Sequence, residues 1–128
     1  TFRNLHNWYI AGGEEAMLTA FAHFYTALKP GGVLGIVEHR LPESKLDSDW
    51  TRSGYMPESL TIKLAEQAGF TLEARSEINA NPKDKADHPN GVWTLPPSLR
   101  LGDQDREKYL AIGESDRMTL KFRKPATP

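Results

Sequence analysis

The chain has 128 residues, a formal net charge of -1 and no cysteine. Its length and average apolar content fit one folded domain with its own core and argue against disorder over most of the chain. The balanced charge offers no basic surface for nucleic acid, and no apolar run approaches the roughly 20 residues that span a bilayer. Absence of cysteine excludes disulfides, zinc-thiolate sites and thiol catalysis. We favour a cytoplasmic protein, while a periplasmic location stays open if a signal peptide precedes Thr1.

A helix, a glycine turn and a strand are expected in succession between Glu14 and His39. Apolar spacings of four, three and four predict a helix from Glu14 to Leu28, with its inward face formed by Met17, Phe21, Phe24 and Leu28. Pro30 cannot continue this helix, and Gly31 or Gly32 can take the positive φ of the following turn. The run from Val33 to Val37 is apolar on both faces, which predicts a parallel strand covered by helices on both sides.

The rest of the chain predicts a further helix and two more strands. Residues 41–54 are polar and read as a loop, and a second helix runs from Pro57 to the glycine stop at Gly69. Thr71–Ile78 alternates like a strand near a sheet edge, with Leu72, Ala74 and Ile78 on one side. Residues 79–103 form a long connection between the last two strands, anchored by its apolar residues 92–95. A short helix at about 103–112 and a strand over 118–122 complete the order.

Several local sequences carry a resemblance to a known family. Phe2 to His6 looks like the stretch after a fourth strand, residues 27–34 like a helix-to-fifth-strand turn, and residues 65–70 like the helix end before a sixth strand. With the element order, these segments resemble the C-terminal half of a class I S-adenosylmethionine-dependent methyltransferase. Within that family, residues 92–97 and 113–118 look most like bacterial proteins described only as predicted methyltransferases.

The resemblance implies a fold and a missing part. It implies an α/β fold: the C-terminal half of a Rossmann-like seven-stranded sheet, ending in an antiparallel strand pair whose last strand inserts between the fifth and the sixth. Residues 1–128 would then be a single partial domain, a fragment that begins near the end of a strand. The family's glycine-rich loop and acidic strand end, which bind S-adenosylmethionine, do not occur in this sequence. We therefore expect the chain alone to be inactive and not to bind the cofactor.

The resemblance also assigns roles to residues. Arg3 and Asn4 would lie beside the cofactor's sulfonium, and His6 would act as a base on a hydroxyl or amine acceptor. Glu38 and His39 end the fifth strand, where a carboxylate can orient or polarise a histidine, so both join His6 as catalytic candidates. In the loop over the same sheet end, the candidates for substrate binding are Trp50, Arg52 and Tyr55. Solvation, packing or loop anchoring would account for each of these residues without a function.

Three functions stay open at this stage. The first is methyl transfer to a small-molecule acceptor, with no part for nucleic acid or membrane. The second is a non-catalytic α/β interaction or regulatory module, which a missing upstream glycine-rich turn would favour. The third is a metal-dependent hydrolase using His6, Glu38 and His39, although two histidines and a carboxylate without a tight spacing are weak evidence for a metal. Because a half-sheet has an exposed edge, we also expect the N-terminal half or a second copy, as in a homodimer, to complete it.

Overall fold

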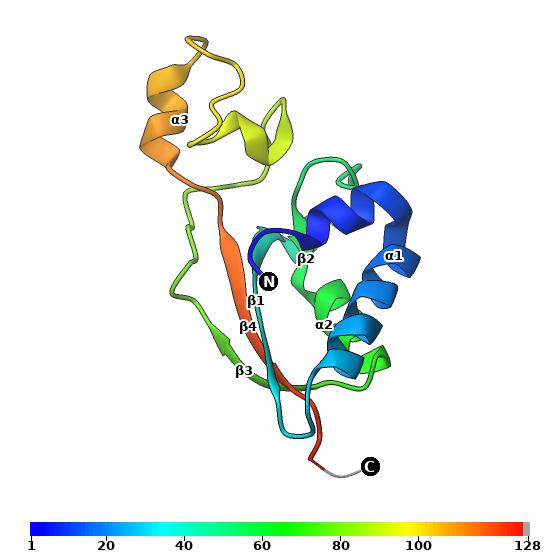
Figure 1. Ribbon diagram of the computed structural model, residues 1–128. Helices are drawn as coiled ribbons and strands as arrows, with labels where there is room; N and C mark the ends of the chain where they lie inside the picture. Colours follow the sequence, from blue (N-terminus) through cyan, green and yellow to red (C-terminus); the bar gives the residue numbers. More distant parts are fainter. Residues whose placement is uncertain (127–128) are drawn as a thin grey trace.

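One four-stranded sheet organises the computed structural model, which describes residues 1–126 (Figure 1). Its strands are β1 (Val33–Leu41), β2 (Met56–Pro57), β3 (Thr71–Ser76) and β4 (Arg117–Arg123), in the order β2-β1-β4-β3. β4 lies between β1 and β3 and is antiparallel to both. The antiparallel terminal pair and the inserted last strand are thus confirmed, and the mixed α/β sheet is consistent with a Rossmann-like fold.

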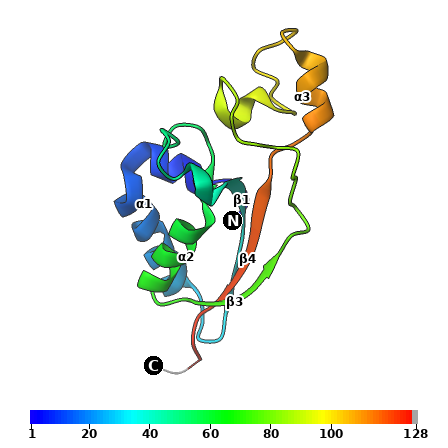
Figure 2. The ribbon, with the colours of Figure 1, turned by 180° about the vertical axis from the view of Figure 1, so that it is seen from behind.

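Two helices cover one face of this sheet. α1 (Leu5–Ala27) and α2 (Glu58–Gln67) lie on the same side in both views (Figures 1 and 2). Leu34 and Ile36 point into this layer, whereas Val33 is 43% exposed and Gly35 is also exposed. The prediction that helices cover both sides of this strand is therefore wrong, because its side chains alternate between a packed face and an open one.

A kink divides α1 into two segments. Gly12 and Gly13 have non-helical backbone angles, with a φ of 69° at Gly13. The segment after the kink corresponds to the helix predicted from Glu14, and the segment before it was not predicted, since a glycine pair favours a break. The C-terminal end of α1 agrees with the prediction. The helix ends at Ala27, and Gly31 takes a φ of 83° in the turn to β1.

The core lies between the two helices and the sheet. Phe21 and Met17 of α1 pack there with Leu64 and Ala65 of α2, against Leu34, Ile36, Met118, Leu120 and Phe122 of the sheet. At the far end of α1, the Lys124 ammonium donates to the carbonyls of Tyr25 and Leu28, 2.7 and 2.8 Å away. This cation satisfies the last carbonyls of the helix and opposes its dipole, so the residue after β4 ties the sheet to α1.

The edge strand departs from the alternation predicted by its sequence, whereas the long connection is anchored by its apolar residues as predicted. β3 is an edge strand as expected, but Ala74 is exposed, next to an irregularity in the register between Leu72 and Ala74. The strand ends at Ser76, so Ile78 lies in the turn after it and is 82% exposed. The connection contains a short 3-10 helix, η2 (Gly91–Thr94), whose Val92 is buried, as is Leu95 after it. The predicted short helix is α3 (Arg106–Ile112), which lies beyond the end of the sheet (Figure 1).

The first residues run beside β1. Phe2 forms a parallel bridge with Val37, through hydrogen bonds of 2.6 Å from the Arg3 amide to the Val37 carbonyl and of 3.0 Å from the Val37 amide to the Thr1 carbonyl. This pairing is that of a strand end leading into a helix, as the sequence predicted for Thr1–His6. On the same side of β1, the short β2 pairs in parallel with Arg40 and Leu41. Within residues 1–126, no helix combines the length and apolar character that crossing a bilayer requires.

Candidate functional site

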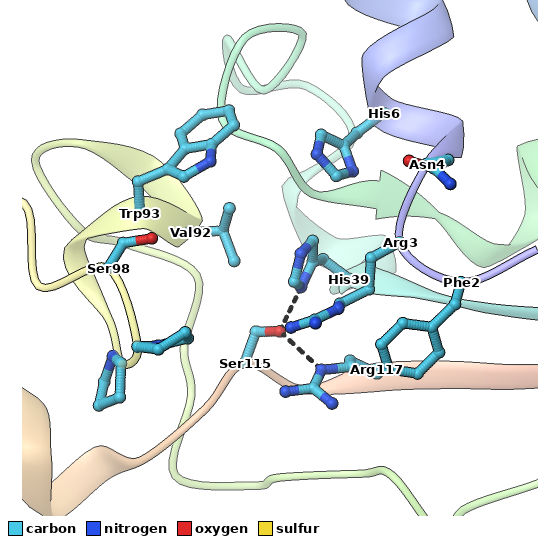
Figure 3. Close-up of a pocket in the computed structure, with 12 residues that line it drawn as sticks. Phe2, Arg3, Asn4, His6, His39, Val92, Trp93, Ser98, Ser115 and Arg117 are labelled. Atoms are coloured by element: carbon cyan, nitrogen blue, oxygen red, sulfur yellow. Dashed lines mark hydrogen bonds between the residues drawn. The ribbon is translucent and has the colours of Figure 1, made fainter.

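A cavity of about 400 Å³ opens where β1 ends and β4 begins. Four segments far apart in the sequence line it: residues 2–6 at the start of α1, the end of β1 at His39, the connection around η2, and the start of β4 with the residues before it (Figure 3). Its lining residues are Phe2, Arg3, Asn4, His6, His39, Val92, Trp93, Pro96, Pro97, Ser98, Ser115 and Arg117. The cavity thus lies at the carboxyl end of a sheet strand, the usual place for a ligand in an open α/β sheet.

Glu38 and His6 form a buried pair at one wall of this cavity. The Glu38 side chain is fully buried, and its two oxygens accept hydrogen bonds of 3.2 Å from the backbone amides of Leu5 and His6. The first turn of α1 therefore satisfies the carboxylate, with the positive end of the helix dipole beside it. His6 Nδ1 donates to the same carboxylate. This bond fixes the ring, and in the neutral imidazole it makes Nε2 the nitrogen that can accept a proton, in a side chain that lines the cavity.

His39 lies beside His6 but takes different partners. The two imidazole rings are 5.2 Å apart, and His39 Nδ1 shares a short hydrogen bond with the Ser115 hydroxyl. Burial, followed by the charges of His6, Arg117 and Arg3, lowers the pKa of His39 to about 3. His39 is therefore neutral near pH 7, and it offers the cavity a hydrogen bond rather than a positive charge.

Two arginines form the cationic end of the cavity. Arg117 is 11% exposed, with Nε 3.4 Å from the Ser115 hydroxyl oxygen and Nη2 2.5 Å from a Glu114 carboxylate oxygen. Arg3 reaches the same Glu114 oxygen at 3.7 Å, and its guanidinium lies over the Phe2 ring. Two guanidiniums thus share one carboxylate, which leaves a positive charge at this end.

The opposite wall comes from the long connection. The Trp93 ring lies 5.9 Å from the His6 ring in an edge-on arrangement. A buried carboxylate, Asp84, holds this connection to the sheet: it accepts from the Tyr55 hydroxyl at 2.8 Å, from His88 Nε2 at 2.9 Å and from the Asp116 amide at 3.0 Å. The carboxylate of Asp116 in turn pairs with Arg40 of β1. This network places the aromatic wall over the end of the sheet.

The structure brings together five of the eight predicted site residues. His6, His39, Arg3 and Asn4 line the cavity, and Glu38 holds His6 from behind. The predicted substrate residues lie elsewhere. Tyr55 is buried against Asp84, Trp50 packs on Tyr9 with ring centroids 5.1 Å apart, and Arg52 borders a separate hollow near His88. The loop that carries them folds beside α1 and the connection, so its aromatic residues anchor it instead of facing the cavity.

Sequence reasoning did not assign Trp93, Ser115 or Arg117 to this cavity. The resemblance covers residues 92–97 and 113–118 without giving any of them a role in a site. For Ser115 and Arg117 the available signal was position, because residues 113–118 run into the last strand, whose start must lie beside the end of β1 in an antiparallel pair.

The three residues considered for a metal do not form a set of ligands. Glu38 is occupied by α1 and His6, while His39 bonds to Ser115. Among residues 1–126, no group of three histidine, aspartate or glutamate side chains is arranged to hold a metal ion. These contacts give the hydrolase hypothesis no support.

Comparison with known proteins supports the fold. No family model and no curated protein match the sequence. Among solved structures, the chain is similar to the [4+2]-cyclase SpnF, with a TM-score of 0.54 and 20% sequence identity. The match covers 87% of this chain and 46% of that chain, so the chain spans about half the length of SpnF. At this identity the likeness shows the fold alone, and with the observed strand order it supports a methyltransferase-like α/β fold.

Proposed function

We propose that this chain supplies the acceptor side of an enzyme that transfers a methyl group from S-adenosylmethionine to a small molecule. The observation that carries the proposal is the Glu38–His6 pair, which sets a histidine with a fixed tautomer at the wall of a cavity. A carboxylate that orients a histidine is a common arrangement for a general base. Here it would remove the proton from the acceptor's hydroxyl or amine as the methyl group leaves sulfur.

The residues present do not make a complete cofactor site. S-adenosylmethionine would supply an electrophilic methyl group, and the resemblance assigns only Arg3 and Asn4 to the surroundings of the cofactor's sulfonium. Asn4 is exposed, and the glycine-rich turn and acidic strand end do not occur among the 128 residues. We therefore assign this chain the tasks of orienting the acceptor, excluding water from it and accepting its proton.

The likeness to a cyclase suggests a second candidate, in which the cavity folds a substrate for ring closure without methyl transfer. A fold serves many chemistries, so the site must decide between them. The lining favours the first candidate, because two histidines, two arginines and two serines suit a polar acceptor better than an apolar polyene.

The test is methyl transfer by the protein that carries this chain together with a glycine-rich cofactor half. The assay follows radioactive methyl groups from S-adenosylmethionine into small phenols and amines, and compares the wild type with His6→Gln. We expect the variant to lose 100-fold or more in kcat/KM. An unchanged rate in His6→Gln would refute the assigned base. No transfer to any acceptor by a protein that binds the cofactor would refute the proposed reaction.

A further inference from the structure

The charge distribution inside the cavity specifies an acceptor class. His6 and Arg117 lie at opposite ends of a row of side chains, with His39 and Ser115 between them (Figure 3). The His6 end offers a nitrogen that accepts a proton, and the Arg117 end offers guanidinium donors. A small molecule in this row would present a nucleophile at one end and an anion at the other.

The donors at the cationic end are built into the fold. Arg117 is in β4 and is 11% exposed, so its position is set by the sheet and not by solvent. Ser115 is 97% buried, and its hydroxyl lies between Arg117 and His39. Arg3 faces them from the start of the chain, with a backbone φ of 55° that a non-glycine residue rarely adopts. Such a backbone persists where surrounding contacts hold it, often at a binding site.

Glu114 shows which anion this end accepts. Its carboxylate binds both arginines, yet its side chain is 56% exposed. It follows Gly113, which has a φ of 85°, in the short segment between α3 and β4. Because this carboxylate is held only at the surface, a ligand carboxylate that also reaches the Ser115 hydroxyl can replace it.

We propose that the acceptor is a small planar carboxylic acid whose carboxylate lies between Arg3, Arg117 and Ser115 and whose hydroxyl lies at His6 Nε2. This inference rests on the proposed function for the role of His6. Trp93 and Phe2 both line the cavity, from opposite sides, and these aromatic rings favour a flat ring between the two ends (Figure 3). Arginine binds a carboxylate in a two-pronged geometry, and an isosteric amide cannot reproduce it.

The experiment measures binding, which separates this inference from methyl transfer. Calorimetry with 4-hydroxybenzoate is compared with its neutral isostere 4-hydroxybenzamide, in the wild type and in Arg117→Gln. We expect at least tenfold tighter binding of the acid by the wild type, and loss of that preference in the variant. Arg106→Gln on the exposed start of α3 is the matched control and keeps the preference. Equal affinities for acid and amide, or no binding of either, overturn the inference.

A second variant guards against a folding defect in Arg117→Gln. Glu114→Gln removes the competing carboxylate from an exposed position, and we expect three- to tenfold tighter binding of 4-hydroxybenzoate with no gain for the amide. Unchanged affinity for the acid in Glu114→Gln counts against the inference even if Arg117→Gln fails to fold.

Two further arms identify the source of the anion. S-adenosylhomocysteine also carries a carboxylate, and if its affinity falls in Arg117→Gln while that of 4-hydroxybenzoate does not, the arginines serve the cofactor and the inference is overturned. Arginine-dependent binding of the acid without any methyl transfer sustains the carboxylate site and refutes the proposed reaction. Equal methyl transfer to neutral and acidic phenols supports the proposed reaction and overturns the carboxylate site.

Discussion

Replacing Glu38 by glutamine tests the buried pair most directly. The substitution keeps the side-chain volume but provides one acceptor oxygen where the carboxylate has two. If the new amino group takes the place of Oε2, it faces the Leu5 amide; if it takes the place of Oε1, it faces the His6 amide. Histidine can adapt its ring by changing tautomer, but a backbone amide cannot. Either orientation therefore leaves one N–H of the first turn of α1 without an acceptor.

The expected cost is about 3 kcal/mol in the free energy of unfolding. An unsatisfied buried donor costs about 1–3 kcal/mol, and losing a negative charge at a helix N-terminus costs up to about 2 kcal/mol. Urea unfolding followed by circular dichroism at pH 7 measures the difference. Glu66→Gln, at an exposed position near the end of α2, is the control and should change stability by no more than about 0.5 kcal/mol. A loss in Glu38→Gln no larger than in this control would refute the reasoning.

Three further predictions concern pH, the long connection and the sheet edge. Because the folded state lowers the pKa of His39 from 6.5 to about 3, protonation favours the unfolded chain, so stability is full above pH 6.5 and falls by about 2 kcal/mol at pH 5. Urea unfolding above pH 6.5 and at pH 5 should show this loss in the wild type and not in His39→Asn. An equal loss in the two proteins would contradict the prediction. Asp84→Asn should cost about 2 kcal/mol by weakening its bonds to Tyr55 and His88 and should open residues 79–103 to protease, while Asp103→Asn should do neither. The edge of β1 beyond the Phe2 bridge should pair with an added segment or a second copy, so a stable, monodisperse monomer in light scattering would count against it.

Periodicity predicted the helices and strands well because the apolar residues that define each element lie close together in the sequence. The spacing in residues 17–28 marked the second segment of α1, and Pro57 with Gly69 framed α2. Strand order followed from the resemblance and was confirmed by the position of β4. The errors arose where a pattern has two meanings: an apolar run such as Val33–Val37 can be buried on one face or on both, and a glycine pair can kink a helix without ending it.

Residues of the candidate site could be predicted only where the sequence pattern assigned them to one end of the predicted sheet. His6 follows the short pairing of Phe2 with β1, and Glu38 and His39 lie near the carboxyl end of β1, so their meeting could be inferred from topology. Trp93 lies in η2, within the long connection, and its place depends on Asp84 holding that connection. Tyr55, Trp50 and Arg52 have the residue types expected of a ligand pocket, but type alone does not say which surface a loop presents.

The position of β4 has a consequence for the order in which the molecule forms during synthesis. β1 and β3 do not pair with each other, and the strand that joins them is made last among the described elements. The β1–β4 register joins residues as distant as Val33 and Arg123. Until the ribosome has released residues 117–123, the two earlier strands lack their shared neighbour and the cavity lacks its cationic end. Sheet and cavity therefore form together, after translation of this segment, in a step that depends on long-range contacts.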